Sequence, residues 1–108
     1  MPNVTIFMPT EKMPPDANLA ALTDLCMHLC TEVLEAAPEN VHIIYVGVGH
    51  GRGNPAYAEI KYRLVPFRTK AVMEAFMERL EAIIKANTGL AARIRCFGYA
   101  APAIHARN

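Results

Sequence analysis

The sequence lacks most of the features that mark secreted, membrane-bound or disulfide-rich proteins. It has no tryptophan, only 7% aromatic residues and three cysteines. An odd and low number of cysteines gives no disulfide framework, so a reducing cytoplasm is the simpler prediction. No apolar run approaches the ~18 residues that cross a membrane. The first residues also lack the basic segment and apolar segment of a signal peptide.

Neither sign of charge dominates the chain. Eleven Lys and Arg residues face ten Asp and Glu residues, for a formal net charge of +1. This balance argues against an electrostatically driven nucleic-acid partner and against a polybasic membrane surface. Hydrophobic residues make up 53% of 108 residues, which is enough apolar material for a core. We expect one domain spanning residues 1–108, because that length leaves little room for two.

Two segments have the apolar spacing of amphipathic helices. In the first, apolar residues recur every three or four positions, at Leu22, Cys26, Leu29 and Val33. Asp16 or Asn18 is expected to cap this helix, and Pro38 to close it. In the second, the apolar positions are Val72, Met73, Phe76, Leu80, Ile83 and Ile84. Thr69 is expected to cap the second helix, and Gly89 to stop it.

Four segments are typical of strands. Residues 4–8 precede the first helix, and the β-rich run 41–48 follows it and is predicted to be a buried strand. Residues 57–65 alternate between apolar and charged side chains, which indicates a half-exposed strand. Residues 92–99 form the last strand.

The order of these elements is β-α-β followed by β-α-β, which indicates a tandem duplication, about 2–55 and 56–108. Strands within each unit should be parallel. The predicted fold is α/β (α+β), with one four-stranded mixed sheet and two helices on one face. The other face would be uncovered and too apolar for water, which predicts a homo-oligomer.

Pro2 offers acid–base chemistry at the start of the first strand. Once Met1 is removed, the terminal group of Pro2 is a secondary amine. Burial and nearby cations would lower the pKa of this amine, because both disfavour its charged form. It could then act as a general base near neutral pH. The structural alternative is a proline that merely begins an edge strand.

The duplicated layout together with Met1-Pro2 resembles the tautomerase superfamily, which includes 4-oxalocrotonate tautomerase, 5-carboxymethyl-2-hydroxymuconate isomerase and macrophage migration inhibitory factor. The resemblance covers nearly the whole chain in layout, although its motifs are short. It implies a terminal proline base, arginines that bind a small carboxylate substrate, and sites between subunits of a trimer. It also implies no metal and no organic cofactor.

The resemblance assigns roles to individual residues. Arg68, between the third strand and the second helix, matches an arginine that binds the substrate carboxylate. The matching place in the first unit is near Lys12. Another arginine of the family begins the second strand of the unit, where this chain has His42 in the first half and Arg93, or Arg95, in the second.

His42 is a departure from that pattern, because an imidazole replaces a fixed cation. Tyr57 is a further candidate for substrate binding, although a packing role with a polar tip is the alternative. Ala58 stands where a second proline would be expected, so one proline serves each chain. Arg93 and Arg95 also fit the polar face of an ordinary strand.

Two other motifs carry less weight. The segment from Cys26 to Cys30 contains His28, but His28 points away from the helix face shared by the two cysteines, so no metal site is expected. The glycine-rich loop 49–55 has no phosphate-binding signature.

The leading hypothesis is a cofactor-independent isomerase that moves a proton between oxygen and carbon in a small 2-oxo or enol acid. One alternative uses protonated Pro2 as a general acid in a hydratase, dehalogenase or decarboxylase. The other is an oligomeric binding module without chemistry, which His42 favours.

Overall fold

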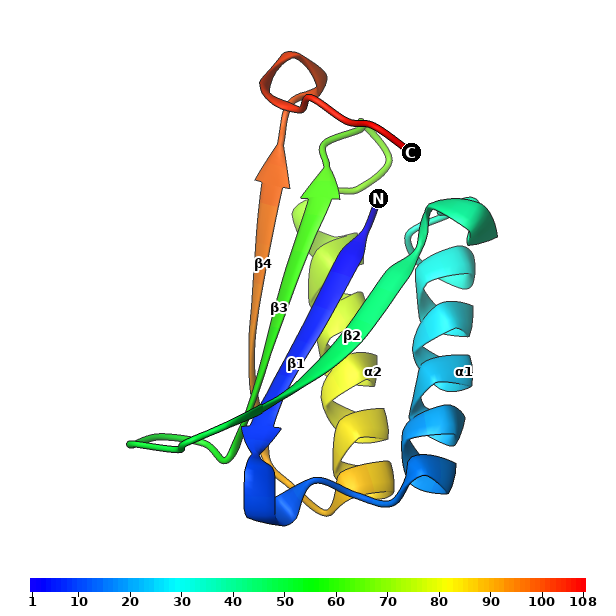
Figure 1. Ribbon diagram of the computed structural model, residues 1–108. Helices are drawn as coiled ribbons and strands as arrows, with labels where there is room; N and C mark the ends of the chain where they lie inside the picture. Colours follow the sequence, from blue (N-terminus) through cyan, green and yellow to red (C-terminus); the bar gives the residue numbers. More distant parts are fainter.

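A computed structural model describes residues 1–108 as a four-stranded sheet with two helices on one face (Figure 1). The strands are β1 (Asn3–Pro9), β2 (His42–Val48), β3 (Ala56–Arg63) and β4 (Ala92–Tyr99), and the helices are α1 (Asp16–Glu32) and α2 (Lys70–Thr88). The strand order is β2-β1-β3-β4. Strand β2 runs parallel to β1 and β4 parallel to β3, whereas β1 and β3 are antiparallel. This confirms the predicted mixed sheet of two β-α-β units.

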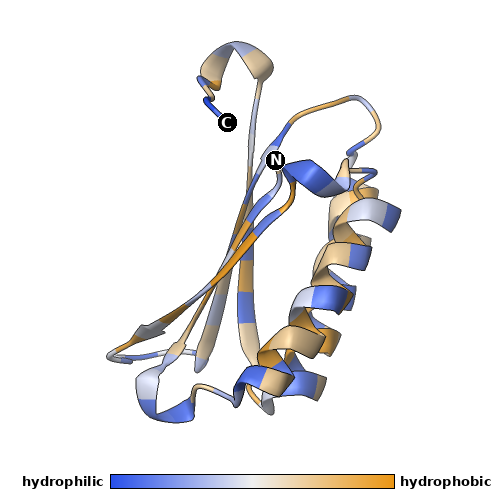
Figure 2. Ribbon diagram, turned by 45° about the vertical axis from the view of Figure 1, so that its right-hand side comes forward, coloured by the Kyte–Doolittle hydropathy of each residue, from blue (hydrophilic) through white to orange (hydrophobic).

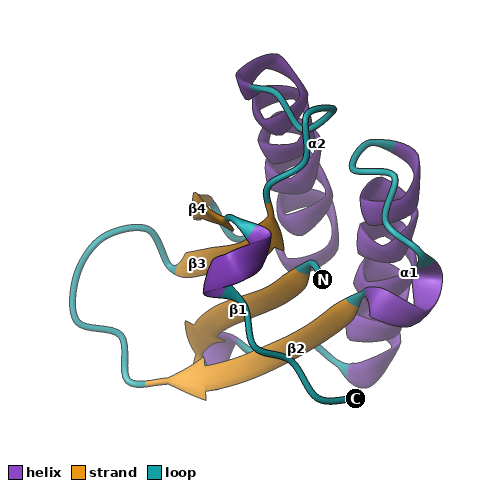
Figure 3. Cartoon of the chain, turned by 90° about the horizontal axis from the view of Figure 1, so that it is seen from above, coloured by secondary structure: helices purple, strands orange, loops and turns teal.

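The core lies between the sheet and the helices, which Figure 3 shows together on one side of the strands. Alternate residues of the central strands point into it because side chains of a strand alternate between its faces. From β1 and β3 these are Val4, Ile6, Met8, Ala58 and Ile60, and from the helices Leu22, Cys26, Leu29, Phe76, Leu80 and Ile84. Figure 2 shows hydrophobic and hydrophilic residues alternating along both helices, as expected for amphipathic elements.

The ends of α2 confirm the predicted signals. The Thr69 hydroxyl accepts a hydrogen bond from the Val72 amide at 3.3 Å, and Gly89 adopts a left-handed φ of 73°. The prediction for α1 was wrong, because Pro15 is the N-cap residue and no side chain caps this helix. Asn18 instead donates from its amide to the Asn87 carbonyl at 3.1 Å, which ties α1 to the end of α2.

The prediction that residues 41–48 form a buried strand was also wrong. Strand β2 lies at the edge of the sheet, and its residues alternate between exposed and half-buried. A β-rich composition does not distinguish an edge strand from a central one, because both favour the same side chains. The strand order, set by the pairing of β1 with β3, puts β2 at the edge.

The face opposite the helices mixes apolar and charged side chains, and its β4 strand carries the exposed ring of Phe97. Residues of β1 and β2 contribute Phe7, Ile44 and Val46 to it, with Ile44 41% exposed. Residues of β3 and β4 contribute charge, namely Glu59, Lys61, Arg63, Arg93 and Arg95. The predicted bare face is therefore present, but its apolar area is smaller than the sequence indicated. No helix is long and apolar enough to cross a membrane.

Leu80→Ala tests the core. Leu80 is fully buried in α2, so its truncation should destabilise the protein by about 2–5 kcal/mol through lost burial and a residual cavity. Urea unfolding measures the change. Leu25→Ala is the matched control, because Leu25 also lies within a helix but is 42% exposed. It should cost under about 1 kcal/mol, and equal losses would contradict the assignment of the core.

Candidate active site

Antiparallel pairing places the start of β1 beside the end of β3. Asn3 pairs with Lys61, so Met1 and Pro2 lie next to Arg63 and the segment that follows it. On the other side of β1, the His42 amide donates a hydrogen bond to the Pro2 carbonyl at 3.1 Å. Three elements thus converge on the N-terminus, two of them from distant parts of the chain.

A pocket of about 860 Å³ lies at this end of the sheet. Its lining includes Met1, His42, Arg63 and Arg68, together with the C-terminal residues 104–108. Figure 1 shows both chain termini at this end. Pro2 is less than 2% exposed, whereas Met1 is half-buried and lines the pocket. Loss of Met1 would therefore turn the Pro2 nitrogen into the terminal amine of this pocket.

Arg68 connects the pocket to the fold. Its Nε donates to the Leu34 carbonyl at 3.0 Å, and its Nη1 donates to the Arg63 carbonyl at 2.8 Å. These bonds hold the chain just beyond α1 against the end of β3. A guanidinium has five N–H donors, so three remain after these two bonds, including both on Nη2. The side chain can therefore brace the fold and still present a fork to a carboxylate.

The electrostatics of the pocket favour a neutral amine. Burial, followed by the charges of Arg63 and Arg68, lowers the pKa of the terminal amine at Met1 below its ordinary value. Pro2, the next residue, is more deeply buried than Met1, so after loss of Met1 burial would lower the pKa of its nitrogen in the same direction. A neutral amine with a lowered pKa is the form that a general base requires.

Two carboxylates also line the pocket, Glu35 and Glu39. The Ala36 amide donates to the Cys30 carbonyl at 3.0 Å, and Glu35 has a left-handed φ of 52°. These two features turn the chain just after the end of α1. Left-handed backbone is costly for a residue with a side chain, and such strain clusters at functional sites.

The structure brings together some of the predicted site residues and separates others. His42 and Arg68 line the pocket together with Met1, the residue before Pro2. Lys12 follows the end of β1, and therefore lies at the opposite end of the sheet. Lys12 therefore lies far from Pro2 within one chain. The cation that antiparallel pairing brings beside the N-terminus is Arg63, at the end of β3.

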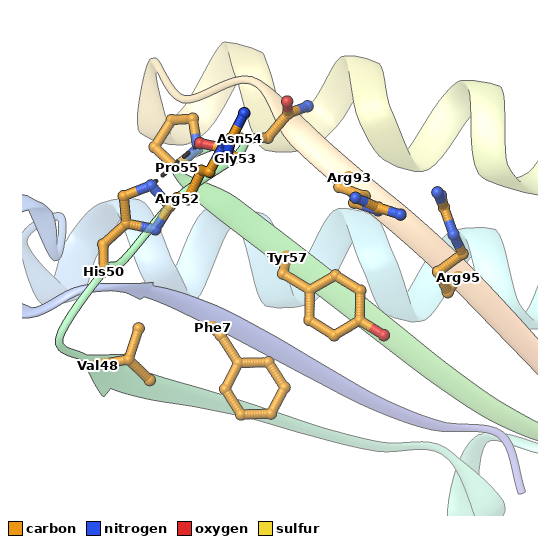
Figure 4. A pocket seen from close by; sticks show the side chains of 10 residues that line it. All are labelled: Phe7, Val48, His50, Arg52, Gly53, Asn54, Pro55, Tyr57, Arg93 and Arg95. Carbon is orange, nitrogen blue, oxygen red and sulfur yellow. Dashed lines mark hydrogen bonds between the residues drawn. The ribbon is translucent and has the colours of Figure 1, made fainter.

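Tyr57, Arg93 and Arg95 also lie away from Pro2. Phe7 pairs with Tyr57, and Tyr57 pairs with Arg93 on β4. Phe7 is five residues along β1 from Pro2, or roughly 17 Å at the rise of an extended strand. These three residues line a separate pocket of about 350 Å³, which Figure 4 shows with the loop 49–55.

Arg63 is a residue that the sequence analysis missed. It was placed on the charged face of a half-exposed strand, which is correct, but its proximity to Pro2 depends on how the strands pair. The antiparallel order of the first and third strands is the signal that could have found it. Strand β3 spans Ala56–Arg63 rather than the predicted 57–65, and it does not begin with a proline.

His28 does not lie with the two cysteines of its segment. Cys26 and Cys30 are buried in the core, whereas His28 is exposed. No group of three or more His, Cys, Asp or Glu side chains converges anywhere in the chain.

Known proteins resemble this chain in structure rather than in sequence. No family model and no curated protein matches the sequence. A macrophage migration inhibitory factor-like protein from Entamoeba histolytica is 13% identical with a TM-score of 0.77, covering 98% of this chain and 95% of that chain. A fused 4-OT symmetric trimer is 11% identical with a TM-score of 0.81, covering 97% and 93%.

A member of the cis-3-chloroacrylic acid dehalogenase family is 12% identical with a TM-score of 0.76, covering 96% of this chain and 79% of that chain. At these identities the matches establish the fold. The chain therefore has the fold of the tautomerase superfamily, as its sequence predicted.

Arg68→Gln tests the brace. Loss of two hydrogen bonds from a charged donor should destabilise the protein by about 1–3 kcal/mol. Urea unfolding measures this change. Arg63→Gln is the control, because the Arg63 side chain makes no hydrogen bond or ion pair, and it should change stability by about 0.5 kcal/mol or less. A smaller loss for Arg68→Gln than for Arg63→Gln would contradict the bracing role.

Proposed function

We propose that the protein is a cofactor-independent tautomerase that acts on a small 2-oxo or enol acid. The observation that carries this proposal lies at the start of β1, where the chain begins in a pocket. Burial and the charges of Arg63 and Arg68 lower the pKa of the terminal amine there. A general base for this chemistry needs such an amine, and the substrate needs cations beside it.

In the proposed reaction, Met1 has been removed and the neutral Pro2 nitrogen accepts the proton of the enol hydroxyl. The same proton, or one exchanged with water, is then delivered to carbon, which yields the 2-oxo acid and restores the neutral amine. Arg68 binds the carboxylate through its free N–H groups. Arg63 and His42 stabilise the negative charge that develops on oxygen.

Lys12, Tyr57, Arg93 and Arg95 would contact this substrate only if a neighbouring chain supplied them. The proposed mechanism does not depend on them, because His42, Arg63 and Arg68 of the same chain already surround the amine. In the sequence-based hypothesis these residues are candidates for substrate binding, in sites that form between subunits.

We also propose that the chain assembles as a homotrimer. Matched 4-OT structures include trimers. The uncovered face of the sheet carries Phe7, Ile44 and Phe97, and the last two are more than 40% exposed. Apolar area of this kind is commonly covered by another subunit.

A general-acid reaction is the second candidate, because Glu35 and Glu39 line the pocket and a carboxylate can activate water. The match to a member of the cis-3-chloroacrylic acid dehalogenase family fits this alternative. The lowered pKa of the terminal amine favours the base, since a general acid needs the charged form at working pH.

Pro2→Ala in protein made without an N-terminal tag tests the proposed base. The ketonisation rate of phenylenolpyruvate should fall by about 10²–10⁴-fold, the usual contribution of a positioned general base. Mass spectrometry first confirms that Met1 has been removed from both proteins.

A second form of the protein keeps the proline ring but removes the free amine, so it tests the two contributions separately. A short N-terminal extension that keeps Pro2 converts its nitrogen to an amide and should abolish the activity. Far-UV circular dichroism checks that the extended protein is folded. Equal rates in the native, Pro2→Ala and extended proteins would reject the tautomerase proposal.

Arg63→Gln tests the electrostatic effect on the amine. In the native protein kcat/KM should rise with pH through the pKa of the amine and level off above it, because the neutral form is active. Removal of the Arg63 charge raises that pKa, so the rising limb should move to higher pH. Activity should then fall near neutral pH and recover in more basic solution.

Arg79→Gln is the matched control for this profile. Arg79 forms an exposed ion pair with Glu32 at 3.7 Å and is not among the charges that act on the amine. Its substitution should leave the limb in place. A kcat/KM that falls as pH rises would instead indicate the general acid.

A further inference from the structure

Residues 104–108 form one wall of the Pro2 pocket, although they follow a strand at the far edge of the sheet. Strand β4 lies at one edge and β2 at the other, yet the segment after β4 lines the same pocket as His42, the first residue of β2. The segment therefore runs past the ends of the central strands, and Figure 3 shows it passing β1 and β2. In Figure 1 it lies beyond the ends of these two strands rather than across the apolar face of the sheet.

Few interactions hold this segment in place. It follows the short helix η3 (Ala101–Ala103), and the Ile104 amide donates a hydrogen bond to the Ala101 carbonyl at 3.1 Å. Ile104 is half-buried, whereas residues 105–108 are exposed and take part in no hydrogen bond. The segment is thus anchored at Ile104, and the residues beyond it can move at little cost in free energy.

The segment brings a further arginine to the pocket. Arg107 lines the pocket and is exposed, and its side chain makes no ion pair. Two carboxylates of the same lining, Glu35 and Glu39, are also free of ion pairs, and their charges attract Arg107 toward the pocket. Arg68, in contrast, is held by two hydrogen bonds to backbone carbonyls. The pocket therefore combines a fixed arginine with a movable one.

The size of the pocket leaves room for the segment to close. Its volume of about 860 Å³ is large for a small organic acid. Ligand pockets span roughly 300–1,000 Å³, and most of them bury the greater part of their ligand. Inward movement of a loosely held wall would reduce the volume and exclude water from the amine.

We propose that residues 104–108 close over a carboxylate ligand in the Pro2 pocket, and that Arg107 binds the ligand carboxylate together with Arg68. The inference rests on the proposed function for the class of ligand, a small organic acid. A carboxylate has two oxygens with about four lone-pair sites, so it can accept hydrogen bonds from two guanidinium groups. Arg107 is then a further substrate-binding residue, and closure adds its contacts only after the ligand has entered.

Cinnamate tests the proposal, because it has the ring and the carboxylate of phenylenolpyruvate but no enol hydroxyl. In calorimetric titration of untagged protein, Arg107→Gln should weaken cinnamate binding by about tenfold or more, the usual effect of losing a charged hydrogen-bond donor. Arg107→Lys keeps the charge without the fork and should lose less affinity. A chain that ends at Ala103 should lose at least as much as Arg107→Gln.

The matched control is Arg79→Gln, which removes an exposed arginine from α2. It should change the affinity for cinnamate by less than about twofold, because surface charges far from a ligand are screened. Urea unfolding checks that each variant is folded. Little change is expected for Arg107→Gln, since the Arg107 side chain is exposed and unpaired.

Carboxypeptidase digestion tests the closure itself. The exposed residues 105–108 should be released from the free protein, and saturating cinnamate should slow their release, as measured by mass spectrometry. A synthetic peptide of residues 99–108 is the control, because cinnamate must leave its digestion unchanged if the protection comes from the pocket.

The proposal is wrong if cinnamate does not bind at millimolar concentration, if Arg107→Gln binds it as tightly as the native protein, or if cinnamate does not protect the segment. These results are distinct from a failure of the proposed function. Binding of cinnamate through Arg107 without any ketonisation of phenylenolpyruvate would reject the tautomerase and leave this inference standing. Ketonisation that depends on Pro2, with cinnamate binding that is indifferent to Arg107, would reject this inference alone.

Discussion

The antiparallel pairing of β1 with β3 is the constraint on which the rest of the molecule depends. It joins the two β-α-β units into one sheet and sends β2 and β4 to the edges. It also sets the start of each central strand beside the end of the other. The N-terminus therefore meets Arg63 and Arg68, while Tyr57 and Arg93 lie at the far end with the loop 49–55.

Arg68 shows how the same side chain serves both the fold and the proposed chemistry. Its two hydrogen bonds to backbone carbonyls hold the chain after α1 against the end of β3, so its guanidinium has a defined position. A positioned charge stabilises a developing anion better than a mobile one, because it needs no reorganisation during the reaction. Arg63 lacks such bonds and contributes mainly through its charge.

The two ends of the sheet use similar residue types differently. At one end, Arg63 and Arg68 surround a terminal amine with a lowered pKa, and Glu35 and Glu39 are close by. At the other end, arginines surround a stacked ring pair with no carboxylate in the lining and no terminal amine. The proposed proton transfer rests on the first arrangement.

The sequence by itself determined the helices, the strands and the Thr69 and Gly89 helix ends, because these follow from local spacing and backbone preference. Pro2 and Arg68 became candidates through the resemblance to a known family. The sequence did not determine that β2 is an edge strand, that Pro15 rather than Asp16 or Asn18 is the N-cap of α1, or that Lys12, Tyr57, Arg93 and Arg95 lie away from Pro2. These depend on which strands pair and in which direction. Strand pairing joins residues far apart in the chain, so only the tertiary structure decided which charges meet.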